Sequence, residues 1–313
     1  MDLISAYSGI LKLFLLFAAG FIMHQTGMVS EDSRTFMSRC ITNVAAPALL
    51  FGNAINYISL ELFTSSPITL VLPMIVSCLS IGIALCFNKI FKMNASGVFY
   101  TLFTYSNSIA AGLPICMAMF GEVSVPYIII YYLCNTLGFW IIGSYFISKD
   151  SDHPIKFGLP MLKNIFSPPL LGFFSGCIIK LTGISLPSPV FDAIEELGGL
   201  TTPLSGLYVG AFIGLVGFKR IFNIDKEGLF VIIGRFVVSP LLMLGLGMLF
   251  NLPPLAITVL VIMAAMPIMN FAVILASRYN GNTALAVQML TTTSVLMMGF
   301  VPIYLTICNI LLY

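Results

Sequence analysis

Residues 98–120 read VFYTLFTYSNSIAAGLPICMAMF, an apolar stretch that is interrupted near its middle. Six of the ten residues in 105–114 are polar, glycine or proline, although the flanks are mostly apolar. The stretch is long enough to cross a bilayer, which takes about 20 mostly apolar residues. Pro114 cannot donate a backbone hydrogen bond, and Gly112 lets the chain leave helical geometry at little cost. We therefore predict a membrane-spanning helix that is interrupted within 105–114, with Gly112 and Pro114 favouring the interruption.

A second interrupted stretch lies in the other half of the chain, where residues 255–277 contain Pro267-Ile268-Met269-Asn270 near their middle. Two broken helices at corresponding places in two halves are the best sequence indication of a transporter binding site. A broken helix presents free N–H groups and the positive end of its dipole within the bilayer, and this end attracts anions. The predicted substrate-binding residues are Asn107, Ser108, Gly112, Pro114, Pro267 and Asn270.

Asn107 and Asn270 would orient the anion, since an amide donates and accepts hydrogen bonds without burying a charge. Pro114 and Pro267 would keep the helix ends open. The alternative is a pair of kinked helices whose asparagines bond neighbouring helices, as polar residues often do in membrane bundles.

The composition is that of a membrane protein. Of the 313 residues, 59% are hydrophobic and 8% are charged, and the mean hydropathy is +1.04, whereas soluble domains carry roughly 25% charged residues. Because lipid leaves backbone groups no other partner, apolar runs of this length are expected to be helices. Ten predicted spans lie at about 4–23, 36–55, 68–87, 98–120, 125–147, 166–186, 197–216, 229–250, 255–277 and 285–312.

Ten helices divide into two groups of five, and a duplicated unit with an odd number of spans inserts upside down the second time, as in many secondary transporters. We predict one transporter unit over 1–313, with a first repeat at 1–147, a cytoplasmic linker at 148–165 and a second, inverted repeat at 166–313. Proline motifs recur in both halves, as Ala46-Pro47-Ala48-Leu49 and Thr202-Pro203-Leu204.

Lysine and arginine indicate the orientation. Eleven of the fourteen lie in or beside the loops that follow odd-numbered spans, whereas the opposite loops carry Lys180 alone. Because cytoplasmic loops are enriched in these residues, the odd loops are expected in the cytoplasm and both termini outside it. We expect a multi-pass protein of the cell membrane.

Several function classes are not supported by the sequence. A net charge of +2 does not suggest a nucleic-acid partner, and no catalytic set, metal-ligand motif, cofactor motif or P-loop is present, so an enzyme is not expected. All twelve acidic residues lie in loops or at predicted helix ends, which argues against an exchanger built on buried carboxylates. Sodium bound by carbonyls and hydroxyls stays open.

Residues with possible supporting roles are Asn43, Pro47, Pro203, Arg235 and Thr292. Arg235, about two turns into the eighth span, could snorkel to the cytoplasmic face, hold the transport core together or attract an anion. Thr292 belongs to a polar run, 291–294, that could face the site or bond its own helix backbone. Lys12, in the first span, is expected to snorkel.

The chain resembles the auxin efflux carrier family, which includes plant PIN-formed carriers and bacterial malonate-type carriers. The resemblance covers nearly the whole chain. The residues that carry it, in order, are Gly27-Met28-Val29-Ser30-Glu31, Ala46 to Phe51, Asn107 with Gly112 and Pro114, Gly234-Arg235-Phe236 with Pro240, and Pro267 followed by Ala276, Tyr279 and Asn280. Lys12 departs from the family, which usually has an uncharged residue there.

The resemblance implies an all-α fold of ten transmembrane helices in two inverted five-helix repeats, with helices 4 and 9 broken and crossing, as in bile-acid symporters and NhaA-like exchangers. Helices 1, 2, 6 and 7 would form a scaffold and a homodimer interface, while helices 3–5 and 8–10 would form a transport domain that moves like an elevator. The expected function is secondary transport, in the direction of efflux, of a small organic anion such as a mono- or dicarboxylate. A sodium-coupled bile-acid-type symporter is the alternative.

Overall fold

The computed structural model describes residues 15–57, 67–93, 95–151, 154–156, 158, 168–217 and 224–313. These residues are overwhelmingly helical, and the one extended pairing among them joins Ser106 to Ile268. Lys12 and most of the predicted linker at 148–165 lie outside the described residues, so their predicted roles stay predictions.

The chain divides into two compact units, each built from two or more separate segments. The first comprises 1–12, 63–155 and 218–313, and the second comprises 13–62 and 156–217. Each unit therefore takes helices from both halves of the chain. The described helices divide between the two units as the family resemblance divides them between a transport domain and a scaffold. The inverted repeat itself stays a prediction.

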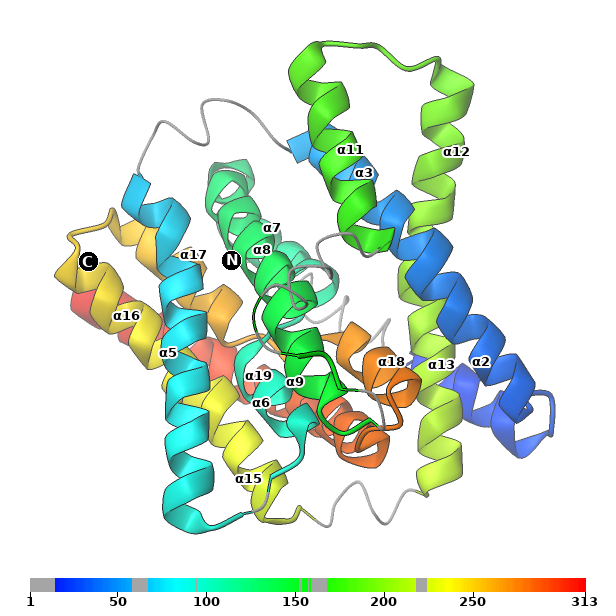
Figure 1. Ribbon diagram of the computed structural model, residues 1–313. Coiled ribbons are helices and arrows are strands. Elements are labelled where there is room, and N and C mark those ends of the chain that lie inside the picture. The colour runs from blue at the N-terminus through cyan, green and yellow to red at the C-terminus, as the bar shows by residue number, and fades with distance from the viewer. Residues whose placement is uncertain are drawn as a thin grey trace. The chain divides into compact units, whose positions relative to one another are not determined.

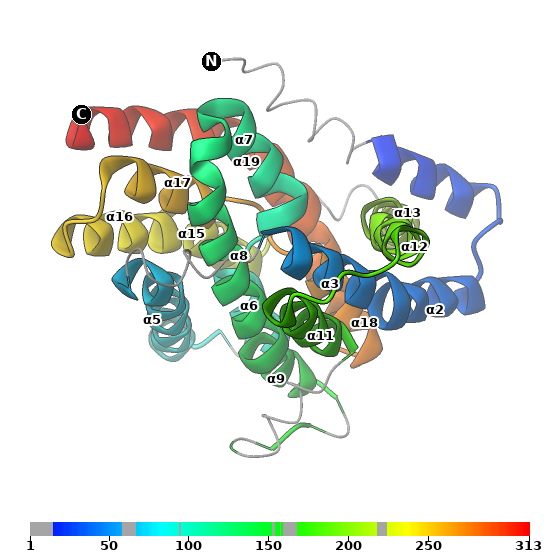
Figure 2. The ribbon, with the colours of Figure 1, turned by 90° about the horizontal axis from the view of Figure 1, so that it is seen from above.

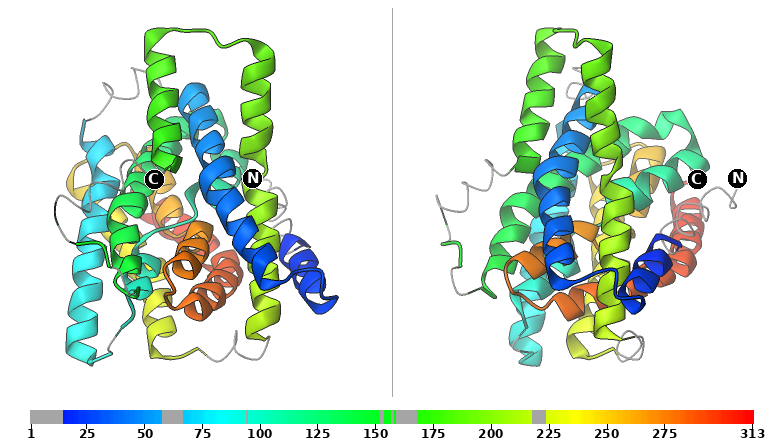
Figure 3. Two further views of the ribbon diagram at one scale, coloured as in Figure 1. Left: turned by 45° about the vertical axis from the view of Figure 1, so that its right-hand side comes forward. Right: turned by 90° about the vertical axis from the view of Figure 1, so that its right-hand side faces the viewer.

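The second unit holds the helix Leu15–Gln25 and a long helical stretch, followed later in the chain by a helical hairpin and one further helix. The bounds are α2 (Glu31–Cys40), the π-helical turn η1 (Ile41–Ala45), α3 (Ala46–Tyr57), α11 (Pro168–Thr182), α12 (Ser188–Gly199) and α13 (Thr201–Val216). Helix α3 runs alongside α11 (Figure 3). A Cβ at Gly176 would lie 2.6 Å from the Phe51 carbonyl oxygen, so this close approach requires glycine.

The first unit holds the remaining helices (Figures 1 and 2). Their bounds are α5 (Pro67–Phe91), α6 (Gly97–Thr104), the π-helical turn η2 (Ser108–Gly112), α7 (Leu113–Phe120), the 3-10 turn η3 (Glu122–Ser124), α8 (Val125–Gly138), the π-helical turn η4 (Phe139–Gly143), α9 (Ser144–Ser148), α15 (Lys226–Ile233), the π-helical turn η6 (Gly234–Val238), α16 (Ser239–Leu249), α17 (Pro254–Ala264), α18 (Asn270–Arg278) and α19 (Thr283–Leu312).

Four continuous helical stretches in this unit are long and apolar enough to cross a membrane: Ile68–Phe91, Val125–Ser148, Lys226–Leu249 and Thr283–Leu312. Shorter apolar helices occur at Leu15–Gln25, Pro168–Thr182 and Pro254–Ala264. The chain is thus a helical protein with several apolar helices suited to a bilayer, and the count of ten crossings stays a prediction.

Carboxylates and an amide begin several helices of the first unit. Asp225 accepts a hydrogen bond from the Gly228 amide at the start of α15, and Asn282 caps α19 in the same way. At the start of α6 the Asp150 carboxylate accepts from the amides of Gly97 (2.5 Å) and Val98 (3.1 Å). Negative charge at a helix N-terminus is stabilising, so α6 is held firmly at the end away from its interruption.

Candidate functional site

The fourth predicted span is interrupted at the start of the segment 105–114 that the sequence marks. Helix α6 ends at Thr104, and helical structure resumes at Ser108. Tyr105 has extended backbone (φ −96°, ψ 132°), and Asn107 has φ −80° and ψ 76°. The break thus spans residues 105–107, inside the predicted segment 105–114 but before Gly112 and Pro114, the two residues expected to favour it.

Gly112 and Pro114 lie in the helix that follows the break, Gly112 as the last residue of the π-helical turn η2 and Pro114 in α7. Within η2 the amide of Gly112 donates to the Asn107 carbonyl (3.2 Å), and the next amide, of Leu113, donates to Ser108, both five residues back. Pro114 follows as an early residue of α7, where a missing N–H is tolerated. Gly112 has a packing role, since a Cβ there would lie 2.6 Å from the Met263 sulfur.

The ninth predicted span is interrupted where the sequence indicates. Helix α17 ends at Ala264, α18 begins at Asn270, and the buried Pro267 lies within the non-helical segment 265–269. The Pro267 carbonyl accepts a hydrogen bond from the backbone N–H of Asn107 (2.8 Å). Together with the antiparallel bridge between Ser106 and Ile268, this bond joins the two interruptions directly.

The two predicted asparagines meet at this junction. The Asn107 side-chain amide donates to the Asn270 side-chain oxygen at 3.0 Å, and each residue is 6% exposed. Ser108, 1% exposed, begins η2 beside Asn107. A primary amide has two donor hydrogens and an acceptor oxygen, so this one bond leaves each asparagine further capacity for a ligand.

Polar residues of two neighbouring helices hold the broken segments. From α8, the Asn135 amide accepts from the Ser106 N–H (3.1 Å) and donates to the Ser106 carbonyl (2.8 Å), as a neighbouring strand would. The Ser106 hydroxyl donates to Tyr131, also on α8, at 3.0 Å. From α19, the Thr293 hydroxyl accepts from the Ile268 amide (3.2 Å).

Sequence reasoning missed Asn135 and Tyr131 as site residues. Asn135 is buried and lies in the middle of an apolar span, and an isolated amide in such a place was an available signal. In the polar run 291–294, Thr293 holds the ninth span, whereas the predicted Thr292 is half-buried on α19.

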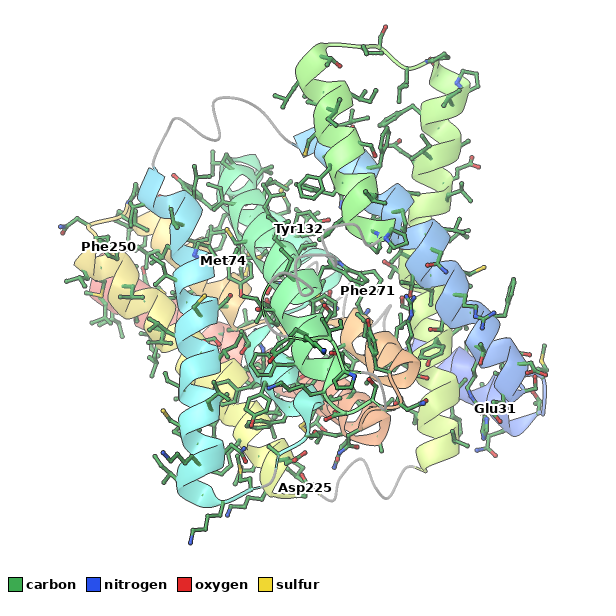
Figure 4. All side chains as sticks on the ribbon, viewed as in Figure 1. Glu31, Met74, Tyr132, Asp225, Phe250 and Phe271 are labelled. Carbon is green, nitrogen blue, oxygen red and sulfur yellow. The ribbon has the colours of Figure 1, made fainter. Side chains whose placement is uncertain are left out.

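Arg235 lies in the interior of the first unit and does not snorkel. It is 0% exposed and lies in η6, in the middle of the continuous helical stretch α15–η6–α16. Figure 4 labels Asp225 and Phe250, the residues directly before and after this stretch. The Arg235 guanidinium donates to the carbonyls of Thr104 (2.6 Å), Ala264 (2.6 Å) and Met266 (2.9 Å). Thr104 and Ala264 are the last residues of α6 and α17, so Arg235 caps both broken helices at their C-terminal ends.

The other three candidates, Asn43, Pro47 and Pro203, belong to the second unit. Asn43 is exposed on η1, and Pro47 and Pro203 are half-buried in α3 and α13. The Pro47 backbone lies against Gly172 of α11, where a Cβ would approach the Pro47 Cα to 2.7 Å. The observed contact of Pro47 is one of helix packing within that unit.

The described residues contain no cluster of three or more His, Cys, Asp or Glu side chains suited to a metal ion. The junction of the two breaks, 105–107 and 265–269, which we call the crossover, instead offers helix termini. The first turns of η2 and α18 bring backbone N–H groups and positive dipole ends to the two asparagines. At the opposite side of each break the carbonyl ends of α6 and α17 are already occupied by Arg235. An anion therefore matches the N-terminal side of the crossover.

Two broken helices that meet in a buried polar junction, among apolar helices of membrane-spanning length, define a membrane transporter by class. Comparison with known proteins agrees. The model of a family described as membrane transport protein matches residues 5–157 and 157–305. The chain therefore belongs to this family, the auxin efflux carriers.

Several relatives, each described as an uncharacterized transporter, align with this chain over most of their length. An uncharacterized transporter of Methanothermobacter thermautotrophicus is 24% identical over 302 residues, which cover 94% of this chain and 96% of the relative. The uncharacterized transporter MJ1031 of Methanocaldococcus jannaschii is 25% identical, covering 86% and 88%. The uncharacterized transporter YfdV of Escherichia coli is 23% identical, covering 90% and 92%.

Proposed function

We propose that this protein is a secondary transporter that exports a small organic anion, such as a mono- or dicarboxylate, and binds it where the two broken helices cross. The observation that carries the proposal is the contact between Asn107 and Asn270, each next to the first turn of a resumed helix and each largely buried. A carboxylate at this point would meet two amide donors and two positive dipole ends.

Among the described residues, no acidic side chain is buried at the asparagine pair, where it would repel such a substrate. Within the part of the chain that the structure describes, the fully buried charged side chain is Arg235, a cation. Because the carbonyl ends of α6 and α17 balance this cation, the preference for negative charge comes from the positive dipole ends of η2 and α18 beside the two asparagines. In a water-excluded site this preference is strong, because charges and dipoles interact more strongly at low dielectric.

Alternating access by an elevator motion is the mechanism we propose. Every crossover residue named above belongs to the unit made of 63–155 and 218–313, so one compact body carries the entire site. Such a body can move as a whole while keeping its substrate contacts, and family analogy assigns the fixed role and the homodimer contact to the other unit. We place the protein in the cell membrane with both termini outside the cytoplasm.

A thermal-shift screen on the purified full-length protein tests the substrate class. We expect small carboxylates to raise the Tm and matched neutral amides to leave it unchanged. Asn107→Ala and Asn270→Ala should weaken the best ligand by about 10-fold or more, because a hydrogen bond to a charged group contributes about 1.5–3 kcal/mol. Asn309→Ala, at an exposed position of α19, is the control and should bind normally.

Flux in proteoliposomes then tests transport itself. Radiolabelled ligand should cross with the wild type and the Asn309→Ala variant and should not cross with Asn107→Ala. Comparing inside-out with right-side-out vesicles gives the direction. Normal flux through correctly inserted Asn107→Ala protein would exclude this site, and stabilisation by cations in place of anions would exclude the substrate class.

A further inference from the structure

The surroundings of Arg235 are those of a bound metal cation rather than those of an ion-paired arginine. Its hydrogen-bond acceptors are backbone carbonyl oxygens, those of Thr104, Ala264 and Met266. The hydroxyl of Tyr131, a neutral side chain, is a further hydrogen-bond partner. No carboxylate contacts the guanidinium within the described ranges of the chain. A charge buried in this way is held by dipoles alone.

These carbonyls belong to two helix C-termini that point at one place. Thr104 ends α6, Ala264 ends α17, and Met266 follows in the break. Each helix C-terminus carries about −0.5 of an elementary charge. Two such ends sum to about −1, which the single positive charge of Arg235 balances. Without a cation, both ends would face each other in the protein interior.

In other secondary transporters with broken helices, unwound carbonyls and half-helix C-termini are the groups that coordinate a coupled Na⁺ or H⁺. Hard cations such as sodium take oxygen ligands of this kind. Here the position is filled by a side chain that is covalently part of the chain. The η6 turn, at which Arg235 lies, is π-helical, a feature frequent at functional sites.

We propose that Arg235 is a built-in substitute for the coupling cation, which makes this transporter independent of sodium. The inference rests on the proposed transport function and extends it to the coupling ion. Arg235 is a positioning residue: it fixes the two broken helices in the crossover, so that Asn107 and Asn270 face the substrate without a bound metal ion. The sodium-coupled alternative is thereby disfavoured.

The test measures the Tm of the purified full-length protein in sodium chloride and in choline chloride at equal ionic strength. The test needs no substrate. Its result therefore does not depend on whether the protein transports the proposed anion, and the two proposals can fail separately. For the wild type we expect the same Tm in both salts. A wild-type Tm that rises with sodium would overturn the proposal, because it would reveal a sodium site that Arg235 does not fill.

The variants are Arg235→Ala and, as a matched control, Met243→Ala, which empties a fully buried position of α16 without removing a charge. Both should lower the Tm, Arg235→Ala by about 10 °C. Sodium at a concentration well above its Kd for Arg235→Ala should raise the Tm of this variant by about 5 °C, because a ligand that binds the folded state stabilises that state. Low-millimolar methylguanidinium should act likewise, and neither cation should affect Met243→Ala.

A purely structural arginine would give a different result. In that case Arg235→Ala would respond to sodium and methylguanidinium no more than Met243→Ala does, and the proposal would fail. If Arg235→Ala cannot be purified, Arg235→Lys takes its place. Lysine keeps a cation at the carbonyls, so this variant should stay insensitive to sodium, and sodium-dependent stabilisation of it would count against the proposal.

Discussion

The two broken helices reach the same junction by different routes. In the ninth span the break contains a proline, Pro267, and the residue pattern marks it directly. In the fourth span the chain leaves helical geometry at 105–107, and the conspicuous Gly112 and Pro114 lie in the helix that follows. Partners from other helices hold the fourth-span break open, chiefly Asn135, which bonds both the N–H and the carbonyl of Ser106.

This difference shows that a helix ends where its backbone groups find other partners, and that a proline is one way among several to cause this. Near Pro114 the helix does not end, because the π-helical turn η2 continues directly into α7. At Ser106 no residue forbids a helix, but Asn135 and the Ile268 strand pairing satisfy the backbone in extended form. Four substitutions separate these contributions.

Arg235→Met should have the largest effect, because it removes the partner of both breaks at once. The carbonyls of Thr104, Ala264 and Met266 would lose their donors, and we expect a loss of about 3–5 kcal/mol of stability. Hydrogen exchange should rise near both interruptions. Arg278→Met, at an exposed position, should change neither quantity, and faster exchange at one interruption alone would contradict a shared role.

Asn135→Leu should affect the fourth span alone. It leaves two buried backbone groups of Ser106 without this partner, at a cost of about 2–4 kcal/mol. Exchange should accelerate around residues 105–108 and stay unchanged around 268. The neighbouring Thr136→Val is the control, since the buried Thr136 hydroxyl makes no hydrogen bond in the structure. Equal effects of the two variants would mean that Asn135 acts by packing.

Thr293→Val should affect the ninth span alone and more weakly. The isosteric change removes the acceptor of the Ile268 amide, which should cost about 1–2 kcal/mol of unfolding free energy. Ser294→Ala, whose hydroxyl bonds its own helix at Leu290, is the matched control and should cost less. Unchanged exchange at Ile268 in the Thr293→Val protein would show that proline alone maintains this break.

Gly112→Ala should have the smallest effect. Its Cβ would press on the Met263 side chain, which is flexible enough to move, so we expect about 1 kcal/mol of destabilisation. The break at 105–107 should persist, as judged by unchanged exchange there. Gly299→Ala on α19, where a Cβ meets nothing within 4 Å, should be neutral. A shift of the break toward residue 112 would restore the glycine-and-proline explanation.

Much of the junction between the two interruptions was predictable because its residues are unusual for their surroundings. Polar and helix-breaking residues in an apolar stretch are costly unless they serve a purpose, so Asn107, Pro267 and Asn270 could be identified without coordinates. Asn135 could not be assigned to the same junction, since it lies on a different helix and its partner is the backbone of Ser106. A backbone acceptor leaves no mark in the sequence.

The sequence by itself determined that this protein is a helical membrane transporter with two interrupted spans, because composition and the length of apolar runs decide which solvent a chain can occupy. Only the tertiary structure decided where the fourth span breaks and that Arg235 caps both broken helices. The reason is physical: these features depend on hydrogen bonds between segments about 30 to 160 residues apart, and such pairings are set by packing rather than by local residue preference.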